Sequence, residues 1–230
     1  MQPRLRTRAL ARAAAFGLGL AVPVALLAYL VRAQVPAVVD LDERAVAAAT
    51  DLTRAHPPLL GVALAWQELF QARWVNLAGS LVCLWVWRRH GLATRALWAF
   101  STILAGWGLQ LVVKAAVQRA RPVVDEALTD APGSSFPSGH VTNFACTATA
   151  VTLLVWPLLG RGGRAVVATT ACVLLVGTAL DRVAVGAHFP SDVAAGALLG
   201  TAIAGASYVG YAGWSARGPG SPEPPPGSHP

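Results

Sequence analysis

The feature that most constrains this chain is the recurrence of apolar stretches long enough to cross a lipid bilayer. A spanning helix needs about 20 mostly apolar residues to cover ~30 Å of hydrocarbon. We read six such stretches, of which the second is short: about 13–31, 74–87, 97–113, 141–159, 165–180 and 193–213. Only 13% of the residues are charged, against about 25% in soluble domains. The sequence therefore predicts an all-α fold, a polytopic six-transmembrane-helix bundle.

The length leaves no room for a second folded unit beside six spans. We expect a single six-span membrane domain over residues 1–216 and a disordered, Pro/Gly-rich cytoplasmic tail over 217–230. Between the first two spans, Pro57-Pro58 divides the segment 32–72 into two helical stretches, the second of which mixes aromatic and polar side chains. This mixture predicts a short interfacial helical segment. A plain amphipathic connector explains it as well as a role in lipid access does.

The basic residues indicate orientation rather than nucleic-acid binding. The net charge is +7, but no basic stripe with interleaved aromatic side chains follows a nucleic-acid backbone. Arginines instead gather before the first span and in alternate connections: Arg4, Arg6, Arg8, Arg12, Arg88, Arg89, Arg95, Arg161, Arg164 and Arg217. By the positive-inside rule, both termini are cytoplasmic. We expect a multi-pass protein of the cytoplasmic membrane, whose first span, at about 19 apolar residues, exceeds the 7–15 of a cleaved signal peptide and is an uncleaved anchor.

The first of three polar patterns closes the third span, with Lys114 followed seven residues later by Arg121-Pro122. Lys114 is the only lysine among 18 basic residues. Its ammonium is a point charge, whereas a guanidinium grips two oxygens at once, so the two can hold different parts of an oxyanion. For Lys114 alone, a snorkelling cation at a helix end is the simpler interpretation. Arg119, between them, reads as another interfacial cation.

The second pattern, Pro137-Ser138-Gly139-His140, opens the fourth span. Ser138 is a good N-cap, and Gly139 lets backbone approach a ligand closely. The free amides and positive dipole end of a helix would then face an anion, as at phosphate-binding helix N-termini. His140 would stand beside that anion. An ordinary cap followed by an interfacial histidine is the alternative.

The third pattern, Arg182-x5-His188-x3-Asp192, links the last two spans. Pro190 is a natural first-turn residue for the final span, and a spacing of four across a helix start lets the Asp192 carboxylate meet the His188 imidazole. Such a contact fixes the tautomer and makes the other ring nitrogen more nucleophilic. A carboxylate buried in a membrane protein is by default a functional candidate with a partner. A surface pair of little consequence is the other interpretation.

Together these three patterns resemble the type 2 phosphatidic acid phosphatase family, lipid phosphate phosphatases that share a pocket with vanadium haloperoxidases. The resemblance covers roughly residues 40–210. It implies a six-span bundle, no metal or other cofactor, and a phosphohistidine intermediate, with a membrane lipid phosphate as substrate. His188 would be the nucleophile, Asp192 its orienting partner and His140 the general acid. The phosphoryl oxygens would be bound by Lys114, Arg121, Ser138, Gly139 and Arg182.

One residue departs from the family pattern, which usually has Ser before the arginine of the third pattern, where this chain has Asp181. A carboxylate facing a phosphate would repel it, so Asp181 must turn away, pair with a cation or stay protonated. Two alternatives to hydrolysis remain open. A phosphotransferase would use the same residues with a lipid or sugar hydroxyl in place of water, and a membrane transporter or scaffold would carry a residual pocket. Phosphatidate, phosphatidylglycerol phosphate and polyprenyl diphosphate all fit as substrates.

Overall fold

The computed structural model describes residues 3–124, 128–129 and 131–215, and the expected tail over 217–230 lies outside them. The described part of the chain is helical, without a β-strand. Its elements, in order, are α1 Pro3–Arg32, α2 Pro36–Ala55, α3 Pro57–Leu69, α4 Ala72–His90, α5 Ala93–Val117, α6 Gly139–Val155, the short 3-10 helix η1 Trp156–Leu158, α7 Arg161–Ala184 and α8 Pro190–Ser215.

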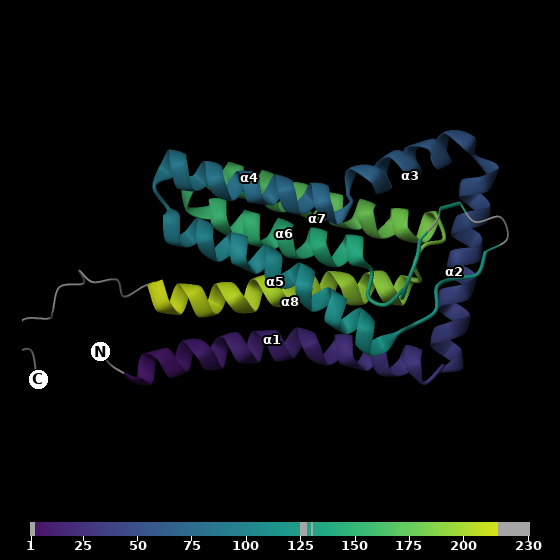
Figure 1. Ribbon diagram of the computed structural model, residues 1–230, viewed down its shortest axis with the longest axis horizontal. Helices are drawn as coiled ribbons and strands as arrows, with labels where there is room; N and C mark the ends of the chain where they lie inside the picture. Colours follow the sequence, from purple (N-terminus) through teal and green to yellow (C-terminus); the bar gives the residue numbers. More distant parts are fainter. Residues whose placement is uncertain (1–2, 125–127, 130, 216–230) are drawn as a thin grey trace, which may run out of the picture.

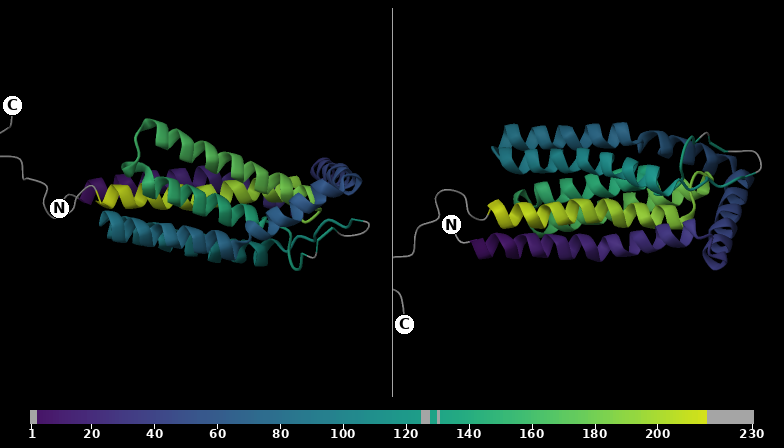
Figure 2. Two further views of the ribbon diagram at one scale, coloured as in Figure 1. Left: turned by 90° about the horizontal axis from the view of Figure 1, so that it is seen from above. Right: turned by 60° about the horizontal axis from the view of Figure 1, so that its bottom comes forward.

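Six long helices run lengthwise beside one another, and α2 crosses one end of the bundle (Figure 1). The most extensive contacts join α8 to α1 and to α6, and α6 also packs on α5, α4 and α7. The α4–α5 and α6–α7 connections lie at the end where α1 begins and α8 ends (Figure 2). The α5–α6 and α7–α8 connections lie at the opposite end, beside α2. The arginine-rich connections and the polar patterns therefore occupy opposite ends.

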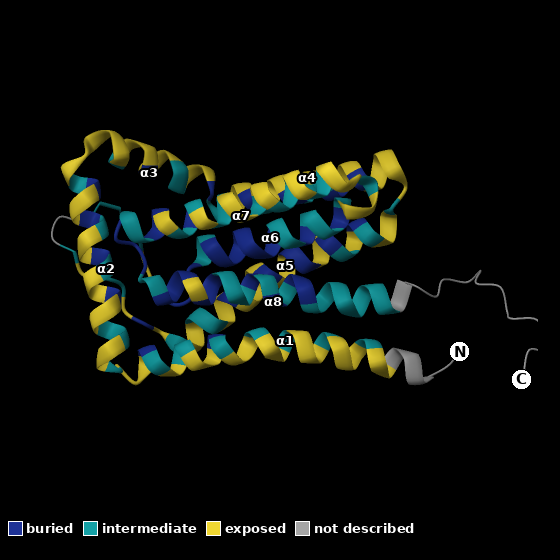
Figure 3. Cartoon of the chain, turned by 180° about the vertical axis from the view of Figure 1, so that it is seen from behind, coloured by how far each residue is buried: buried dark blue, intermediate teal, exposed yellow. Residues whose placement is uncertain are grey.

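The helices have the length and surface of membrane spans. Five of them are long and apolar enough to cross a bilayer: Thr7–Arg32, Ala93–Val117, Gly139–Leu158, Arg161–Ala184 and Pro190–Gly213. The pair α3 and α4, bent by 52° at its break, passes the same test together and corresponds to the short second stretch of the sequence. Exposed residues lie on the outer faces of the helices (Figure 3), and many of them are large and apolar, including Leu81, Leu97 and Val166. The predicted all-helical membrane fold is confirmed.

The segment between the first two spans forms two helices, divided at the predicted prolines. α2 begins at Pro36 and α3 at Pro57, where the missing proline N–H is not needed by the helix. α2 buries one face, which carries Asp42, Val46 and Thr50 at a spacing of four. Asp42 is only 1% exposed. α2 is therefore more than a surface connector, because it turns a carboxylate into the protein.

Small residues let α8 approach α6 closely. A Cβ at Gly196 would lie 3.0 Å from the Ser138 carbonyl oxygen, and one at Gly200 would lie 2.8 Å from the Ala145 Cβ. The spacing of four between these glycines is the pattern that brings membrane helices into backbone contact. Because His140 lies in the first turn of α6 and Asp192 in the first turn of α8, this contact sets the distance between two parts of the candidate site.

Replacing Gly200 with alanine should therefore destabilise the bundle. The added methyl group meets backbone atoms of α6, which cannot move aside, and we expect a loss of about 1–3 kcal/mol, as for overpacked cores. Gly108→Ala is the matched control, since a Cβ there meets nothing within 4 Å. Thermal unfolding in detergent should show a lower Tm for Gly200→Ala alone. Equal Tm values for the two variants would contradict close α6–α8 packing.

Candidate active site

The three sequence patterns meet at the end of the bundle that α2 crosses. Lys114 lies in the last turn of α5, His140 in the first turn of α6, and Asp192 in the first turn of α8, while Arg121 and His188 lie in connections. A cavity of about 310 Å³ opens among them. Five of the eight predicted site residues line it: Lys114, Arg121, Gly139, His140 and His188. The structure thus brings residues from separate helices to one small space.

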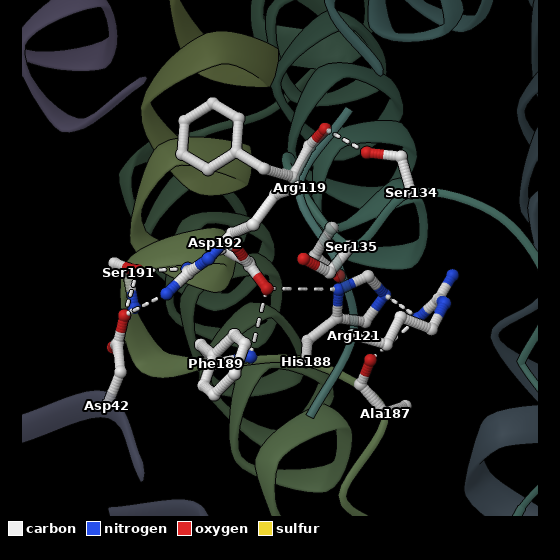
Figure 4. Close-up of polar contacts among 12 residues, drawn as sticks. Asp42, Arg119, Arg121, Ser134, Ser135, Ala187, His188, Phe189, Ser191 and Asp192 are labelled. Atoms are coloured by element: carbon white, nitrogen blue, oxygen red, sulfur yellow. Dashed lines mark hydrogen bonds and ion pairs between the residues drawn. The ribbon is translucent and has the colours of Figure 1, made fainter. Parts of the chain in front are cut away.

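His188 lies between a carboxylate and a guanidinium (Figure 4). Its Nδ1 is 3.6 Å from Asp192 Oδ2, an ion-pair distance longer than a hydrogen bond. Its Nε2 is 3.3 Å from Arg121 Nη1. A neutral ring with its proton on Nδ1, toward Asp192, leaves the Nε2 lone pair facing Arg121 and the cavity. This is the tautomer that an attacking imidazole requires.

The turn that carries His188 is fixed by its own backbone. The amides of Ala187 and His188 both donate to the Arg182 carbonyl oxygen at 3.1 Å. Gly186 has φ +72°, which an L side chain rarely adopts, and a Cβ there would lie 2.9 Å from Thr50 Cγ2 of α2. The left-handed turn therefore packs directly on α2, and its shape presents His188 to the cavity.

Burial sets the charge of His188, which is only 3% exposed. Loss of hydration lowers the pKa of the His188 imidazole to about 4, although the nearby Asp192 carboxylate acts in the opposite direction. Arg121 and Lys114 lower this pKa further by repulsion. Burial also lowers the pKa of Arg121, which nevertheless stays charged in proteins. The His188 imidazole is therefore neutral at physiological pH.

The two cations of the first pattern point into the site without carboxylate partners. Lys114 Nζ donates to the Ser134 carbonyl oxygen at 2.5 Å. Arg121 donates to three carbonyl oxygens, those of Gly133, Pro132 and Ala187. Across the residues that the structure describes, no Asp or Glu forms an ion pair with either cation. Their positive charge is thus available to an anion in the cavity.

Polar atoms without partners also gather around the cavity. Within the described ranges, buried side-chain atoms that lack a hydrogen-bond partner include Gln110 Oε1, Ser138 Oγ and His140 Nε2. Gly139 lines the same space, and a Cβ there would lie 3.3 Å from Gln110 Oε1 and 3.7 Å from Lys114 Cε. Buried polar groups are nearly always paired, so such a cluster indicates a site that is completed by a polar ligand.

Two predicted phosphate ligands behave differently from the expectation. Ser138 was expected to cap α6, but its side chain makes no capping hydrogen bond; its amide donates to the Asp192 carbonyl oxygen at 3.1 Å. Arg182 is buried but does not line the cavity. Its Nε donates to Asp181 Oδ2 at 2.9 Å, and its Nη2 pairs with the same oxygen. The unusual Asp181 thus pairs with a cation, one of the three outcomes expected for it.

The sequence interpretation missed two buried charges, Arg119 and Asp42. Arg119 was assigned as an interfacial cation, and this is wrong: it is 9% exposed and its guanidinium donates to Asp192, Ser191 and Asp42. Asp42 lies in the segment 32–72, part of which was expected to be an interfacial helix. The helical spacing of Asp42 with Val46 and Thr50 was the available signal, since it places the carboxylate on the inward face. The partner of that carboxylate lies 77 residues away in sequence and could not be read from local pattern.

A helical membrane bundle with a cationic, histidine-bearing cavity at one end defines the class of protein. The sequence profile of the PAP2 superfamily matches residues 95–215, more than half of the chain, so this protein belongs to that superfamily. The expected family resemblance is confirmed.

Individual relatives agree with the family. The decaprenylphosphoryl-5-phosphoribose phosphatase of Mycobacterium tuberculosis is 36% identical over 98 residues, which are 41% of this chain and 49% of that protein. The chain therefore spans about half the length of the curated relatives that it matches. The transmembrane PAP2 type phosphatidylglycerolphosphate phosphatase from Bacillus subtilis has a similar fold, with a TM-score of 0.75, 24% identity and coverage of 84% of this chain and 94% of that one. Aquifex aeolicus LpxE follows, with a TM-score of 0.50, 20% identity and coverage of 70% and 87%.

The depressed pKa of His188 can be measured directly. We expect its imidazole resonance, assigned by its loss in His188→Gln, to titrate near pH 4 in an NMR experiment on the folded protein, rather than near the ordinary value of about 6.5. The sign follows from burial, which disfavours the protonated ring. Because the unfolded state then binds more protons, the protein should also lose stability as the pH falls from about 6.5 toward 4. Recovery of the spectrum at pH 7 controls for acid unfolding, and a midpoint at or above 6.5 would contradict the buried, neutral state.

Proposed function

We propose that this protein is a metal-independent integral membrane phosphatase that hydrolyses a lipid phosphate or polyprenyl diphosphate through a phosphohistidine intermediate. The observation that carries the proposal is the placement of His188 between Asp192 and Arg121, 3.6 Å and 3.3 Å away, at a cavity that His140 also lines. Membership of the PAP2 superfamily supports the reaction class. The phosphatases of lipid-linked substrates among the similar proteins support the substrate class.

The reaction would proceed in two transfers at the phosphorus atom. In the first, His188 Nε2 attacks phosphorus, the bond from phosphorus to the leaving oxygen breaks, and His140 donates a proton to that oxygen. In the second, His140 takes a proton from water as the water oxygen attacks phosphorus, and the bond to Nε2 breaks to release inorganic phosphate. Phosphoryl transfer depends mainly on in-line positioning and charge neutralisation. Both are tasks that fixed cations can perform.

The phosphoryl oxygens would be held by the groups around the cavity. Lys114 and Arg121 supply uncompensated charge, and the Gly139 amide at the start of α6 adds a helix N-terminus. The free Ser138 Oγ is a further donor. Arg182 pairs with Asp181 through Nε and Nη2 and does not line the cavity, so its expected role as a phosphate ligand stays a prediction. Asp192 would hold His188 in the attacking tautomer throughout.

The reaction would take place on the extracytoplasmic face, with both termini in the cytoplasm. The arginine-rich connections gather at the end of the bundle opposite the cavity (Figures 1 and 2). Positive connections favour the cytoplasmic side, so the cavity would open on the other. α2, an amphipathic helix across that end, would lie at the membrane surface.

The two histidines can be separated by choice of substrate. His188→Gln removes the nucleophile, so it should give no phosphoenzyme burst with any substrate. His140→Gln removes proton donation, typically worth about 10²–10⁴-fold, and should be badly impaired on a lipid phosphate. It should nevertheless give a burst with p-nitrophenyl phosphate, whose leaving group departs without that proton. Steady-state turnover should stay low, because water activation needs the same residue.

The controls for this experiment also test the reaction class. Both variants must first show wild-type thermal unfolding in detergent. Assays in excess chelator should release inorganic phosphate from a panel of purified lipid phosphates, while transfer to an added alcohol instead of water would identify a phosphotransferase. A burst from His188→Gln would show that the nucleophile is misassigned. Wild-type activity that is lost with chelator and restored by magnesium would exclude the metal-independent mechanism.

The orientation can be tested at Val123, which follows Arg121 and is 99% exposed. We expect Val123→Cys, in a background without the three native cysteines, to react with a membrane-impermeant thiol reagent on intact cells. A cysteine in place of Gly162, in the first turn of α7 at the opposite end of the bundle, is the opposite-side control and should react only after lysis. Reversed labelling of the two positions would overturn the proposed orientation.

A further inference from the structure

Behind His188 lies a chain of buried charges that reaches from α8 to α2. Arg119 Nη1 donates to Asp192 Oδ1 at 2.7 Å, and Arg119 Nη2 donates to Asp42 Oδ2 at 2.8 Å. The guanidinium also lies over the Phe189 ring, 4.0 Å from its centroid. Asp42 Oδ1 accepts the Ser191 amide at 3.0 Å. Figure 4 shows this succession of contacts, in which each carboxylate and the guanidinium have defined partners.

Arg119 fixes the orientation of the Asp192 carboxylate, which faces His188. Asp192 uses Oδ1 for Arg119 and Oδ2 for both the Phe189 amide, at 2.9 Å, and His188. With Oδ1 held by Arg119, the carboxylate cannot rotate away from the imidazole. A guanidinium presents two donors in a rigid plane, so Arg119 can hold Asp192 and Asp42 at fixed positions at once.

The charges suggest why α2 must supply a second carboxylate. Arg119 paired with Asp192 alone would use up the negative charge that polarises His188. Asp42 adds a negative charge on the far side of the guanidinium, so that Asp42, Arg119 and Asp192 together carry a net charge of −1. A buried group of this kind is tolerated only when each charge is paired and hydrogen-bonded.

We propose that Asp42 and Arg119 are positioning residues for the phosphatase reaction, in which Arg119 fixes the Asp192 carboxylate and Asp42 balances the charge of Arg119. Together they set the orientation and basicity of His188. Asp42 lies outside the segment 95–215 that matches the superfamily. The inference therefore assigns to the surface helix α2 a part in the reaction, and it rests on the proposed role of His188.

The test uses neutral substitutions whose electrostatic effects have opposite signs. Asp42→Asn leaves Arg119 unbalanced, so the pKa of His188 should fall below the wild-type value. Arg119→Gln frees the Asp192 charge, so the pKa of His188 should rise. In the double variant the two changes cancel, and the pKa should return close to the wild-type value. NMR titration of His188 measures all three without requiring turnover.

The titration must take account of every charged or titratable group that faces His188. These are Asp192 from α8, Lys114 from α5, Arg121 from the α5–α6 connection, His140 from α6 and, through its carbonyl oxygen, Arg182 from α7. None of them is altered in the variants. Asp40→Asn is the matched control, since it makes the same chemical change on an exposed face of α2 and should alter neither the pKa nor the activity.

Kinetics should show a loss in kcat rather than in KM. Arg119→Gln and the double variant remove the donor that holds Asp192, and we expect kcat to fall about 10- to 100-fold, as for other residues that orient a catalytic ligand. KM should change less than about threefold, because neither residue lines the cavity. Arg119→Lys should recover the charge but only part of kcat, since one ammonium cannot bridge both carboxylates in a plane.

Several outcomes would overturn the proposal. If Asp42→Asn and Arg119→Gln both raise the pKa of His188 toward the ordinary value of about 6.5, both substitutions act by admitting water. The network would then serve only to keep His188 buried. If a single variant does not fold, the double variant, which keeps the net charge of the network at −1, decides alone, and a wild-type kcat in it would refute the positioning role. An inactive wild-type protein whose His188 titrates as expected would leave the charge network standing and remove the proposed function instead.

Discussion

The burial of Arg119 is the constraint on which the active end of this protein depends. A guanidinium taken out of water must be paired and hydrogen-bonded, or it costs several kcal/mol. Here it is met by Asp42 from α2, Asp192 from α8, the Ser191 hydroxyl and the Phe189 ring. Asp42 comes from α2, whereas Phe189, Ser191 and Asp192 lie close together in sequence at the start of α8, far along the chain. By contacting all of these groups, Arg119 connects α2, which crosses the end of the bundle, to the start of α8.

The proposed nucleophile His188 and the cations of the cavity are held by different contacts. Asp192, held by Arg119, faces one side of the His188 ring, and Arg121 faces the other. The carbonyl oxygens that hold Arg121 and Lys114 fix their positions without neutralising them. Asp42 and Asp192 pair with Arg119, and Asp181 pairs with Arg182, whereas neither Lys114 nor Arg121 has an acidic partner among the described residues. This separation of paired and unpaired charge supports the proposed binding of a phosphate without a metal.

Much of this arrangement was predictable, because it depends on patterns that are local in sequence. Apolar periodicity located the helices, and the spacing of four between His188 and Asp192 across Pro190 predicted their approach. The proline pair at 57 and 58 predicted the break between α2 and α3. Each of these features is set by the physics of one helix or one turn. The placement of Lys114, His140 and His188 around one cavity followed from resemblance to the family rather than from pattern alone.

What the sequence could not supply is long-range pairing. A single charged residue in an amphipathic helix, such as Asp42, has the same local signature whether it faces water or a buried arginine. Arg119 was assigned to the membrane surface because nothing nearby in sequence requires its burial. The capping hydrogen bond expected of Ser138 is not formed, and the contact between its amide and the Asp192 carbonyl oxygen of α8 is another pairing between residues far apart in the chain.

Helix α2 contacts the residues on both sides of His188, although it lies across the end of the bundle and not within it. Asp42 and Thr50 occupy the buried face of α2, and they touch the two parts of the α7–α8 turn that flank His188: Asp42 meets Ser191, and the Thr50 methyl group meets the Gly186 turn. Any tilt of α2 at the membrane surface would move both contacts together. The contacts of α2 therefore help to fix the position of His188, in addition to the contacts among the spanning helices. Through these contacts, a change in the lipid around α2 would alter the geometry of His188.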